Sequence, residues 1–249
     1  MDSADIPTYS GQVPTVSIQQ MVEVDRAMME NYGIDLVQMM ENAGRNLAHL
    51  ARLRFLDGQP QGKKVVILTG TGGNGGGALV CARRLHTWGA LVRVFVTRPD
   101  ADLAPVPAHQ LAILRRMEVP VASASEVSSA EYPDLIVDGL IGYSLKGNPR
   151  GAAANLIRWA NGQRAPILAL DVPSGMDAMS GTAFAPAIRA TATMTLALPK
   201  EGLRAPDTEE LVGELYLADI SVPPSLYAQP PLGLQVGHLF AESDIIRLR

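Results

Sequence analysis

The chain has 249 residues, 47% of them hydrophobic, which is enough to bury the core of one α/β domain. Its net charge of −4 and its scattered lysines and arginines exclude the basic surface that a nucleic-acid-binding protein needs. No apolar run reaches the roughly 18 to 20 residues of a membrane span, and the first residues do not read as a secretory signal. The single cysteine, Cys81, rules out an internal disulfide. We therefore expect a cytoplasmic protein that binds neither nucleic acid nor a membrane.

Predicted helices and strands alternate along the chain. A polar arm at 1–15 is followed by two helices, and the second has a core-facing stripe that includes Leu36, Met39, Met40, Ala43, Leu47, Leu50 and Ala51. Short apolar runs predict strands at 65–69, 91–96, 134–139, 166–171, 192–198 and 214–220. Helical periods lie between most of them, at 78–88, 107–117 and 150–161. This order predicts a doubly wound α/β fold with a mostly parallel sheet covered on both faces.

We expect one domain over 1–249, because no internal repeat or linker divides the chain. The segment 228–249 is a C-terminal tail that either docks on the domain or stays free. In a fold of this class, ligands bind outside the carboxyl ends of the strands. Residues that follow the predicted strands are therefore the candidates for function.

A glycine-rich segment, "LTGTGGNGGGAL" at 68–79, follows the first of these strands. Glycines let backbone N–H groups approach a ligand, and the helix start behind them favours a phosphate. The segment is not a P-loop, because no Gly-Lys-Ser/Thr closes it. Gly70, Gly72 and Gly75 fit G-x-G-x-x-G, but the acidic residue expected about 20 positions later in a dinucleotide-binding site is missing. A turn whose glycines serve only close packing is the alternative.

Two acids, Asp138 and Asp171, each end a predicted strand. In that position both carboxylates can face one crevice and share a cation or a reacting hydroxyl. Ser174 and Asn74 add two further oxygen donors. An all-oxygen set suits a hard cation such as potassium, sodium or magnesium. A strand-end aspartate is also a common helix cap or turn former, so this reading stays open for each of them.

Five ordered motifs resemble those of one known family. They are "GTGGNGGGALVCARRL", "VDGLIGYSLKG", "LDVPSGMD", "LALPKEGL" and "GELYLADISVPPSLY", and the earlier "QMMENAG" is similar to the family's first long helix. Together they resemble the YjeF N-terminal domain family, whose enzymes are NAD(P)H-hydrate epimerases. The likeness runs from about Val16 to Tyr227. It implies a Rossmann-like three-layer αβα sandwich with a mostly parallel central sheet, a homodimer and a bound potassium ion (K+).

The resemblance also implies site residues. Potassium ligands fall on Asn74, Asp138 and Ser174, and the substrate-contacting acid falls on Asp171. The other substrate-binding positions fall on two segments, Gly73, Asn74, Gly75, Gly76 and Gly77, and Gly142, Tyr143, Ser144, Leu145, Lys146, Gly147 and Asn148. For Lys146, a solvated loop lysine is an equally good reading. Lys200 in "PKEGL" matches a family signature, and a structural turn explains it about as well.

The glycine segment departs from the family pattern G-P-G-N-N-G-G-D-G. Gly73 stands where the family has its first Asn, Gly77 where it has Asp, and Ala78 where it has the last Gly. Loss of a positioned acid–base group costs on the order of a hundred- to ten-thousand-fold in rate. Two functions therefore remain open. One is an epimerase acting on hydrated NADH or NADPH, with Asp171 as its acid–base residue, and the other is a catalytically impaired module that binds nucleotide ligands or a protein.

Overall fold

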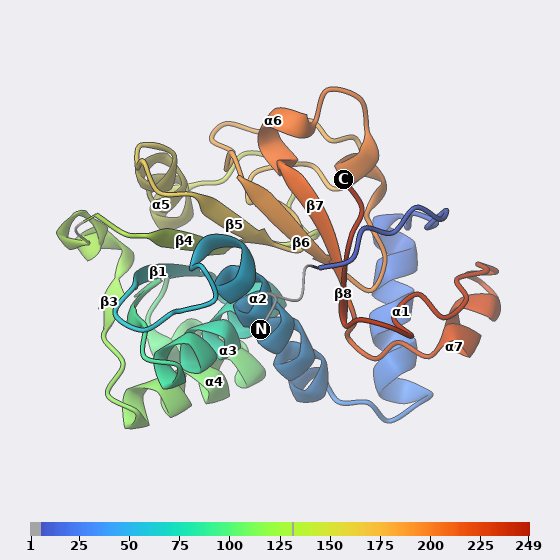
Figure 1. The fold of residues 1–249 in the computed structure, drawn as a ribbon, viewed down its shortest axis with the longest axis horizontal. Helices are drawn as coiled ribbons and strands as arrows, with labels where there is room; N and C mark the ends of the chain where they lie inside the picture. Colours follow the sequence, from blue (N-terminus) through green and yellow to red (C-terminus); the bar gives the residue numbers. More distant parts are fainter. Residues whose placement is uncertain (1–5, 131) are drawn as a thin grey trace.

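The computed structural model describes residues 6–130 and 132–249, which form a single eight-stranded sheet with helices on both faces (Figure 1). The strands run in the order β3-β2-β1-β4-β5-β6-β7-β8. All neighbours are parallel except the antiparallel pair β7 and β8. The strands are β1 (Lys64–Thr69), β2 (Leu91–Val96), β3 (Val121–Ser123), β4 (Leu135–Gly139), β5 (Ile167–Leu170), β6 (Ala192–Leu196), β7 (Glu214–Ala218) and β8 (Ile245–Arg247).

The α-helices are α1 (Ile18–Glu30), α2 (Leu36–Phe55), α3 (Gly73–Thr87), α4 (Pro105–Arg116), α5 (Gly151–Asn161), α6 (Glu209–Val212) and α7 (Pro224–Ala228). Three 3₁₀ turns complete the described elements, η1 (Asp100–Asp102), η2 (Ala124–Ser129) and η3 (Glu201–Arg204). Helices α2, α3 and α4 lie together on one side of the sheet (Figure 1). Helix α5 packs on the opposite face, so the predicted three-layer αβα sandwich with a mostly parallel sheet is confirmed.

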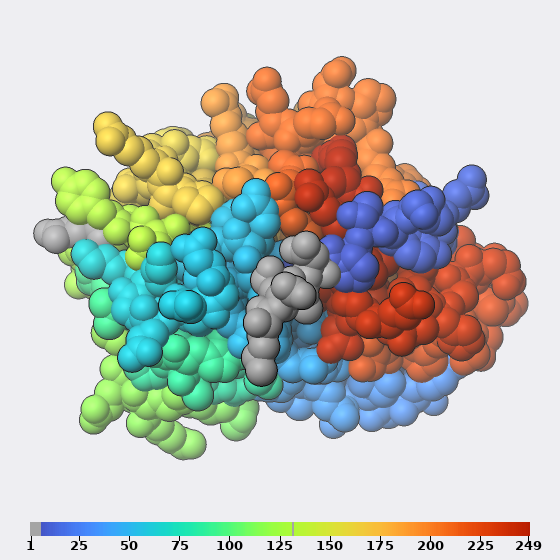
Figure 2. Space-filling view, viewed as in Figure 1, coloured from blue at the N-terminus to red at the C-terminus, as the bar shows by residue number. Residues whose placement is uncertain are grey.

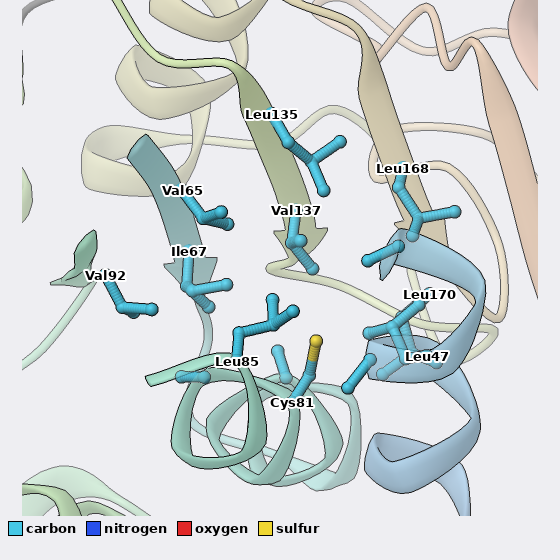
Figure 3. Packing of buried hydrophobic residues seen from close by; sticks show 14 of the residues in the cluster. Leu47, Val65, Ile67, Cys81, Leu85, Val92, Leu135, Val137, Leu168 and Leu170 are labelled. Carbon is cyan, nitrogen blue, oxygen red and sulfur yellow. The ribbon is translucent and has the colours of Figure 1, made fainter. Parts of the chain in front are cut away.

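Alternation along the central strands explains why helices cover both faces. In β1, Val65 and Ile67 pack against α2 and α3, whereas Val66 and Leu68 join the cluster around α5. Side chains of α3, such as Leu85, meet the strand residues at close range (Figure 3). A strand with apolar residues on both sides needs a cover on each face. The apolar runs of the sequence therefore predict that helices cover both faces of the sheet.

Six strands and five longer helices lie within a few residues of their predicted positions. The clearest difference is α3, which begins at Gly73 instead of residue 78 and so takes in most of the glycine-rich segment. Glycine disfavours helix by about 1 kcal/mol per residue relative to alanine. Here tertiary packing outweighs that preference, because Gly76 and Gly77 are buried and lie close to Met40 and Ala43 of α2.

Both ends of the described chain pack on the same flank. The C-terminal tail docks through β8, whose Arg247 pairs with Tyr216 of β7. Tyr9 donates its backbone N–H to the carbonyl of Arg247 at 2.9 Å. Figure 2 shows the blue N-terminal segment lying against the red C-terminal one. Residues 1–5 of the predicted arm fall outside the described residues.

Strands β3 and β8 were not predicted, because each has three residues and neither forms an apolar run long enough to stand out. Of the helices in the described ranges, none is long and apolar enough to cross a membrane.

Candidate active site

A cavity of about 560 Å³ opens at the carboxyl ends of the central strands. The segments after β1, β4, β5 and β6 form one side of it, and α1 and α2 form the other. Polar and charged groups come from the strand ends, whereas the helices contribute mainly methionine and other apolar side chains. The lining includes Met21, Asp25, Met29, Met39, Met40, Gly72, Gly73, Asn74, Gly77, Gly142, Tyr143, Ser144, Asp171 and Lys200.

The first turn of α3 forms one wall. Gly72 is the N-cap residue, and Gly72, Gly73 and Asn74 border the cavity. The N–H groups of a first helical turn lack partners within the helix and carry a positive partial charge. This wall is therefore suited to an anionic group such as a phosphate.

The glycines of this segment have two different explanations. A Cβ at Gly75 would collide with the carbonyl oxygen of Gly70, and one at Gly76 would collide with the sulfur of Met40. Neither Gly75 nor Gly76 lines the cavity. A Cβ at Gly73, in contrast, would find its nearest neighbour, a methyl group of Met40, at 3.7 Å. Close packing accounts for Gly75 and Gly76, whereas Gly73 has room for a side chain.

Asp171 and Lys200 form a buried ion pair in the cavity wall. Asp171 directly follows β5 and has a φ of 67°, a left-handed conformation that aspartate tolerates better than most residues. Its Oδ1 accepts a hydrogen bond from Lys200, whose ammonium group also donates to the carbonyl of Leu196 at 3.0 Å. Asp171 is 4% exposed and Lys200 is 0% exposed. A strained backbone and a fully buried charge pair at one strand end are features that cluster at functional sites.

Tyr143 links this pair to helix α1. The ammonium group of Lys200 lies 5.7 Å from the centre of the Tyr143 ring. The phenol of Tyr143 donates a hydrogen bond of 2.6 Å to Oδ2 of Asp25. Burial raises the pKa of Asp25, while the bond from Tyr143 and the charge of Lys200 act in the opposite direction.

Asp138 lies beneath the cavity and is completely buried. Its Oδ1 accepts from the hydroxyl of Ser174 at 2.6 Å and from the N–H of Leu140 at 3.2 Å, and its Oδ2 accepts from the N–H of Ser174 at 2.8 Å. Burial raises the pKa of Asp138 to about 6, and these hydrogen bonds oppose the shift. No lysine or arginine pairs with Asp138 in the described ranges.

The two strand-end acids therefore differ from the expectation that both face the crevice. Asp171 lines the cavity, whereas Asp138 and Ser174 do not. They remain close to the wall, because Leu140 and Ile141 line the cavity and donate to Asp138 and Ser174, respectively. Asn74 connects the regions by donating to the carbonyl of Leu170 at 3.0 Å. The acids share one rim of the sheet but have separate partners.

The second predicted substrate segment is only partly at the cavity. Gly142, Tyr143 and Ser144 line it, and Leu145 to Asn148 do not. Lys146 is exposed to solvent. The side chain of Asn148 instead accepts a hydrogen bond from the N–H of Ala185 at 3.0 Å. The cavity thus contains the near half of this segment.

Sequence reasoning missed two charged groups of the cavity. Lys200 was noted in "PKEGL" after the fifth predicted strand but received no role, although that position was a usable signal. Asp25 could not have been found, because it lies on a helix and its partner Tyr143 is 118 residues away.

The comparisons with known proteins agree with this geometry. Residues 36–202 match the family model described as "YjeF-related protein N-terminus". The chain belongs to this family. The match covers the α2 helix, the glycine-rich turn, both strand-end acids and Lys200.

Several relatives are similar over most of the chain. An NAD(P)H-hydrate epimerase from Dehalogenimonas lykanthroporepellens is 42% identical over 231 residues, which are 90% of this chain and 89% of the relative. One from Rhodopirellula baltica is 33% identical and covers 88% of each chain. A bifunctional NAD(P)H-hydrate repair enzyme from Salinibacter ruber is 35% identical over 85% of this chain, and the match spans 41% of that longer protein. The crystal structure of yeast YNL200c superposes with a TM-score of 0.80 at 27% identity and covers 95% of this chain and 100% of that one.

Proposed function

We propose that the chain is an NAD(P)H-hydrate epimerase, an isomerase that interconverts the R and S epimers of hydrated NADH and NADPH. Similarity to epimerases over about nine-tenths of the chain supports this function. The observation that carries it is the Asp171–Lys200 pair, which shares one cavity with the start of helix α3, a site suited to an anion.

The reaction requires proton transfer at one hydroxyl. In the hydrate, the ring carbon with the hydroxyl is bonded to the ring nitrogen. The hydroxyl takes up a proton and leaves as water while the nitrogen lone pair forms an iminium. Water then adds to either face of that carbon and gives up a proton, so no net proton is consumed. We assign Asp171 as the acid–base residue, because its carboxylate borders the cavity and hydrogen-bonds to a buried ammonium group. Lys200 and the N–H of Leu196, at 3.4 Å, hold the same oxygen of Asp171 and so fix its direction.

The substrate also carries a pyrophosphate. We assign it to the N–H groups at the start of α3, where Gly73, Asn74 and Gly77 line the cavity. Gly142, Tyr143 and Ser144 form the facing wall. We keep Lys146 as a candidate for a phosphate at the cavity mouth, because its exposed side chain is free to turn towards a ligand.

The residues around Asp138 fit a potassium ion. Its carboxylate is fully buried without a basic partner in the described chain. Ser174 and Asn74 each add a side-chain oxygen, the type of ligand that a hard cation prefers. A potassium ion bound there would supply positive charge at the base of the cavity. Without it, these residues order the wall through the bonds from Leu140 and Ile141.

The test is an epimerisation assay with purified protein. A sample enriched in one epimer of hydrated NADH is followed by chromatography as it approaches the equilibrium mixture. Wild-type protein should accelerate this approach over the uncatalysed rate, and Asp171→Asn should lower kcat by about a hundred- to ten-thousand-fold. Equal rates with and without wild-type protein would overturn the proposal.

A binding module without catalysis is the second candidate, and Gly77 favours it. The family carries an acid at this position, and here the cavity is bordered by a residue without a side chain. Activity that appears only after Gly77→Asp would favour the module. Activity of the wild-type chain would exclude it.

We also propose that the chain forms a homodimer in the cytoplasm. The family resemblance supports the dimer, as do the apolar side chains of Val22 in α1 and of Tyr32 just after it, which are 53% and 36% exposed. The compartment rests on the lone Cys81, which is buried and has no partner for a disulfide. Light scattering after gel filtration and cell fractionation would check the two statements, and a monomer or an exported protein would contradict them.

A further inference from the structure

Asp25 is a carboxylate in the cavity wall that the proposed chemistry does not use. It lies on α1, on the side of the cavity formed by the methionines. Its Oδ2 accepts the 2.6 Å bond from Tyr143. Among residues 6–130 and 132–249, no other group donates to this carboxylate, and no lysine, arginine or histidine forms an ion pair with it. Its Oδ1 is therefore left for a donor that enters the cavity.

A carboxylate in this position needs a reason. The cavity wall formed by α1 and α2 also includes the apolar residues Met21, Met29 and Leu36. A charge among such neighbours is costly unless it is hydrogen-bonded. One bond from Tyr143 satisfies only one of the two oxygens. A ligand N–H or O–H that completed the set would make a charge-assisted hydrogen bond, which is stronger than a neutral one.

The position of Asp25 relative to the reacting groups indicates which donor this is. Lys200, bonded to Asp171, lies 5.7 Å from the centre of the Tyr143 ring, and the phenol hydroxyl of that ring contacts Asp25. Tyr143 therefore lies near both charged groups, while Asp25 belongs to the α1 side of the cavity and Asp171 to the strand-end side. In the hydrated nicotinamide, the carbon that bears the hydroxyl lies directly across the ring from the carbon that bears the carboxamide. A ring with its hydroxyl at Asp171 therefore directs its carboxamide NH2 away from the strand ends, towards the side of the cavity that α1 forms.

We propose that Asp25 accepts a hydrogen bond from the carboxamide NH2 of the substrate and thereby orients the ring with its reacting carbon at Asp171. Asp25 is then a specificity-determining residue, and Tyr143 positions it. This inference rests on the proposed epimerase function. The adenine amino group is the other NH2 of the substrate, and the experiment separates the two.

The experiment compares two ligands that differ only in that NH2. These are hydrated NADH and the hydrated 3-acetylpyridine analogue of NADH, in which a methyl group replaces the amide nitrogen. Each is titrated into wild-type protein, Asp25→Ala and Asp25→Asn by calorimetry, and epimerisation is measured in parallel. Wild-type protein should bind the analogue about 10- to 100-fold more weakly, as expected for a hydrogen bond to a charged group. Asp25→Ala should bind both ligands equally, and Asp25→Asn, which retains an acceptor oxygen, should recover part of the preference.

Two control variants distinguish recognition from structure. Glu30→Gln, on the exposed end of the same helix, should retain the full preference for the amide. Tyr143→Phe should also retain it, because the acceptor remains, although the affinity for both ligands falls. If wild type and Asp25→Ala prefer hydrated NADH over the analogue to the same extent, the inference is overturned. That is also the result if Asp25 binds the adenine amino group, because both ligands carry it. If wild-type protein shows the preference and Asp25→Ala loses it, but wild-type protein does not epimerise hydrated NADH, the role of Asp25 is supported and the proposed function is overturned.

Discussion

Replacing Lys200 with methionine should strongly destabilise the fold. Methionine is also unbranched and is one atom shorter than lysine, and the substitution removes the ammonium group with its charge and its hydrogen-bond donors. It leaves the Asp171 carboxylate, 4% exposed, without its cation and leaves the carbonyl of Leu196 without its 3.0 Å donor. Breaking a buried pair in this way costs about 3–5 kcal/mol. For a chain of this size each kcal/mol lowers Tm by about 2–4 °C, so we expect a loss of about 6–20 °C.

Thermal unfolding of four proteins measures this effect. The double variant Asp171→Asn/Lys200→Met removes both charges and should recover a large part of the loss, because no buried charge remains unpaired. The matched control is Lys63→Met, whose partner Asp57 is 86% exposed at 3.4 Å, and its Tm should stay close to that of wild type. A single variant that unfolds at the wild-type temperature would refute the reasoning. So would a double variant that is no more stable than Lys200→Met.

Three further outcomes follow from the same structure. Replacing LiCl by KCl at equal ionic strength should raise Tm, because potassium at a hundred times its Kd adds about 2.7 kcal/mol to the free energy of unfolding. Asp138→Asn should abolish this difference. Gly73→Asn should leave Tm nearly unchanged, whereas Gly77→Asp should lower it, because the new Cβ would lie 2.9 Å from a methyl group of Leu170; equal Tm values would contradict this steric argument. Arg54 lowers the pKa of Glu214 to about 2 by hydrogen bonding, so this carboxylate stabilises the fold above pH 4.5 and loses that effect as the pH falls towards 2. The difference in urea midpoint between wild type and Glu214→Gln should therefore be present at pH 7 and vanish near pH 2, and a constant difference would count against the assignment.

The sheet was predictable because its strands are buried on both faces. The runs at 65–69 and 91–96 are almost continuous apolar segments, and the structure places strands at Lys64–Thr69 and Leu91–Val96. Parallel strands direct their carboxyl ends to one edge, so the residues after them had to share a rim. That rule located Asp171 and the glycine-rich turn without any knowledge of side-chain contacts.

The depth of each side chain at that rim was not predictable. Asp138 and Asp171 both lie near the end of an apolar run, yet Asp138 is completely buried and Asp171 borders the cavity. Asp138 lies within β4 and pairs with Ala169, whereas Asp171 follows the end of β5, and the turn that contains Ser174 hydrogen-bonds to Asp138. Contacts between turns of distant sequence position leave no periodic pattern, so the sequence contains no local signal for them. The pairing of Lys200 with Asp171, 29 residues apart, is hidden for the same reason.

The departure at Gly77 has a consequence for how the proton is moved. The side chain of Leu170 lies where a side chain at this position would start, so the cavity wall is apolar at this point. If the chain epimerises hydrated NADH with Gly77 in place, the acid of the glycine-rich segment cannot be required for proton transfer. Proton transfer must then depend on groups that the chain retains. In the cavity wall these are Asp171 with its partner Lys200, and Asp25 with Tyr143. Only the first pair extends from the end of a central strand, beside the helix start that suits the substrate's phosphates. Under the proposed function, the hydroxyl-bearing carbon is therefore placed at Asp171.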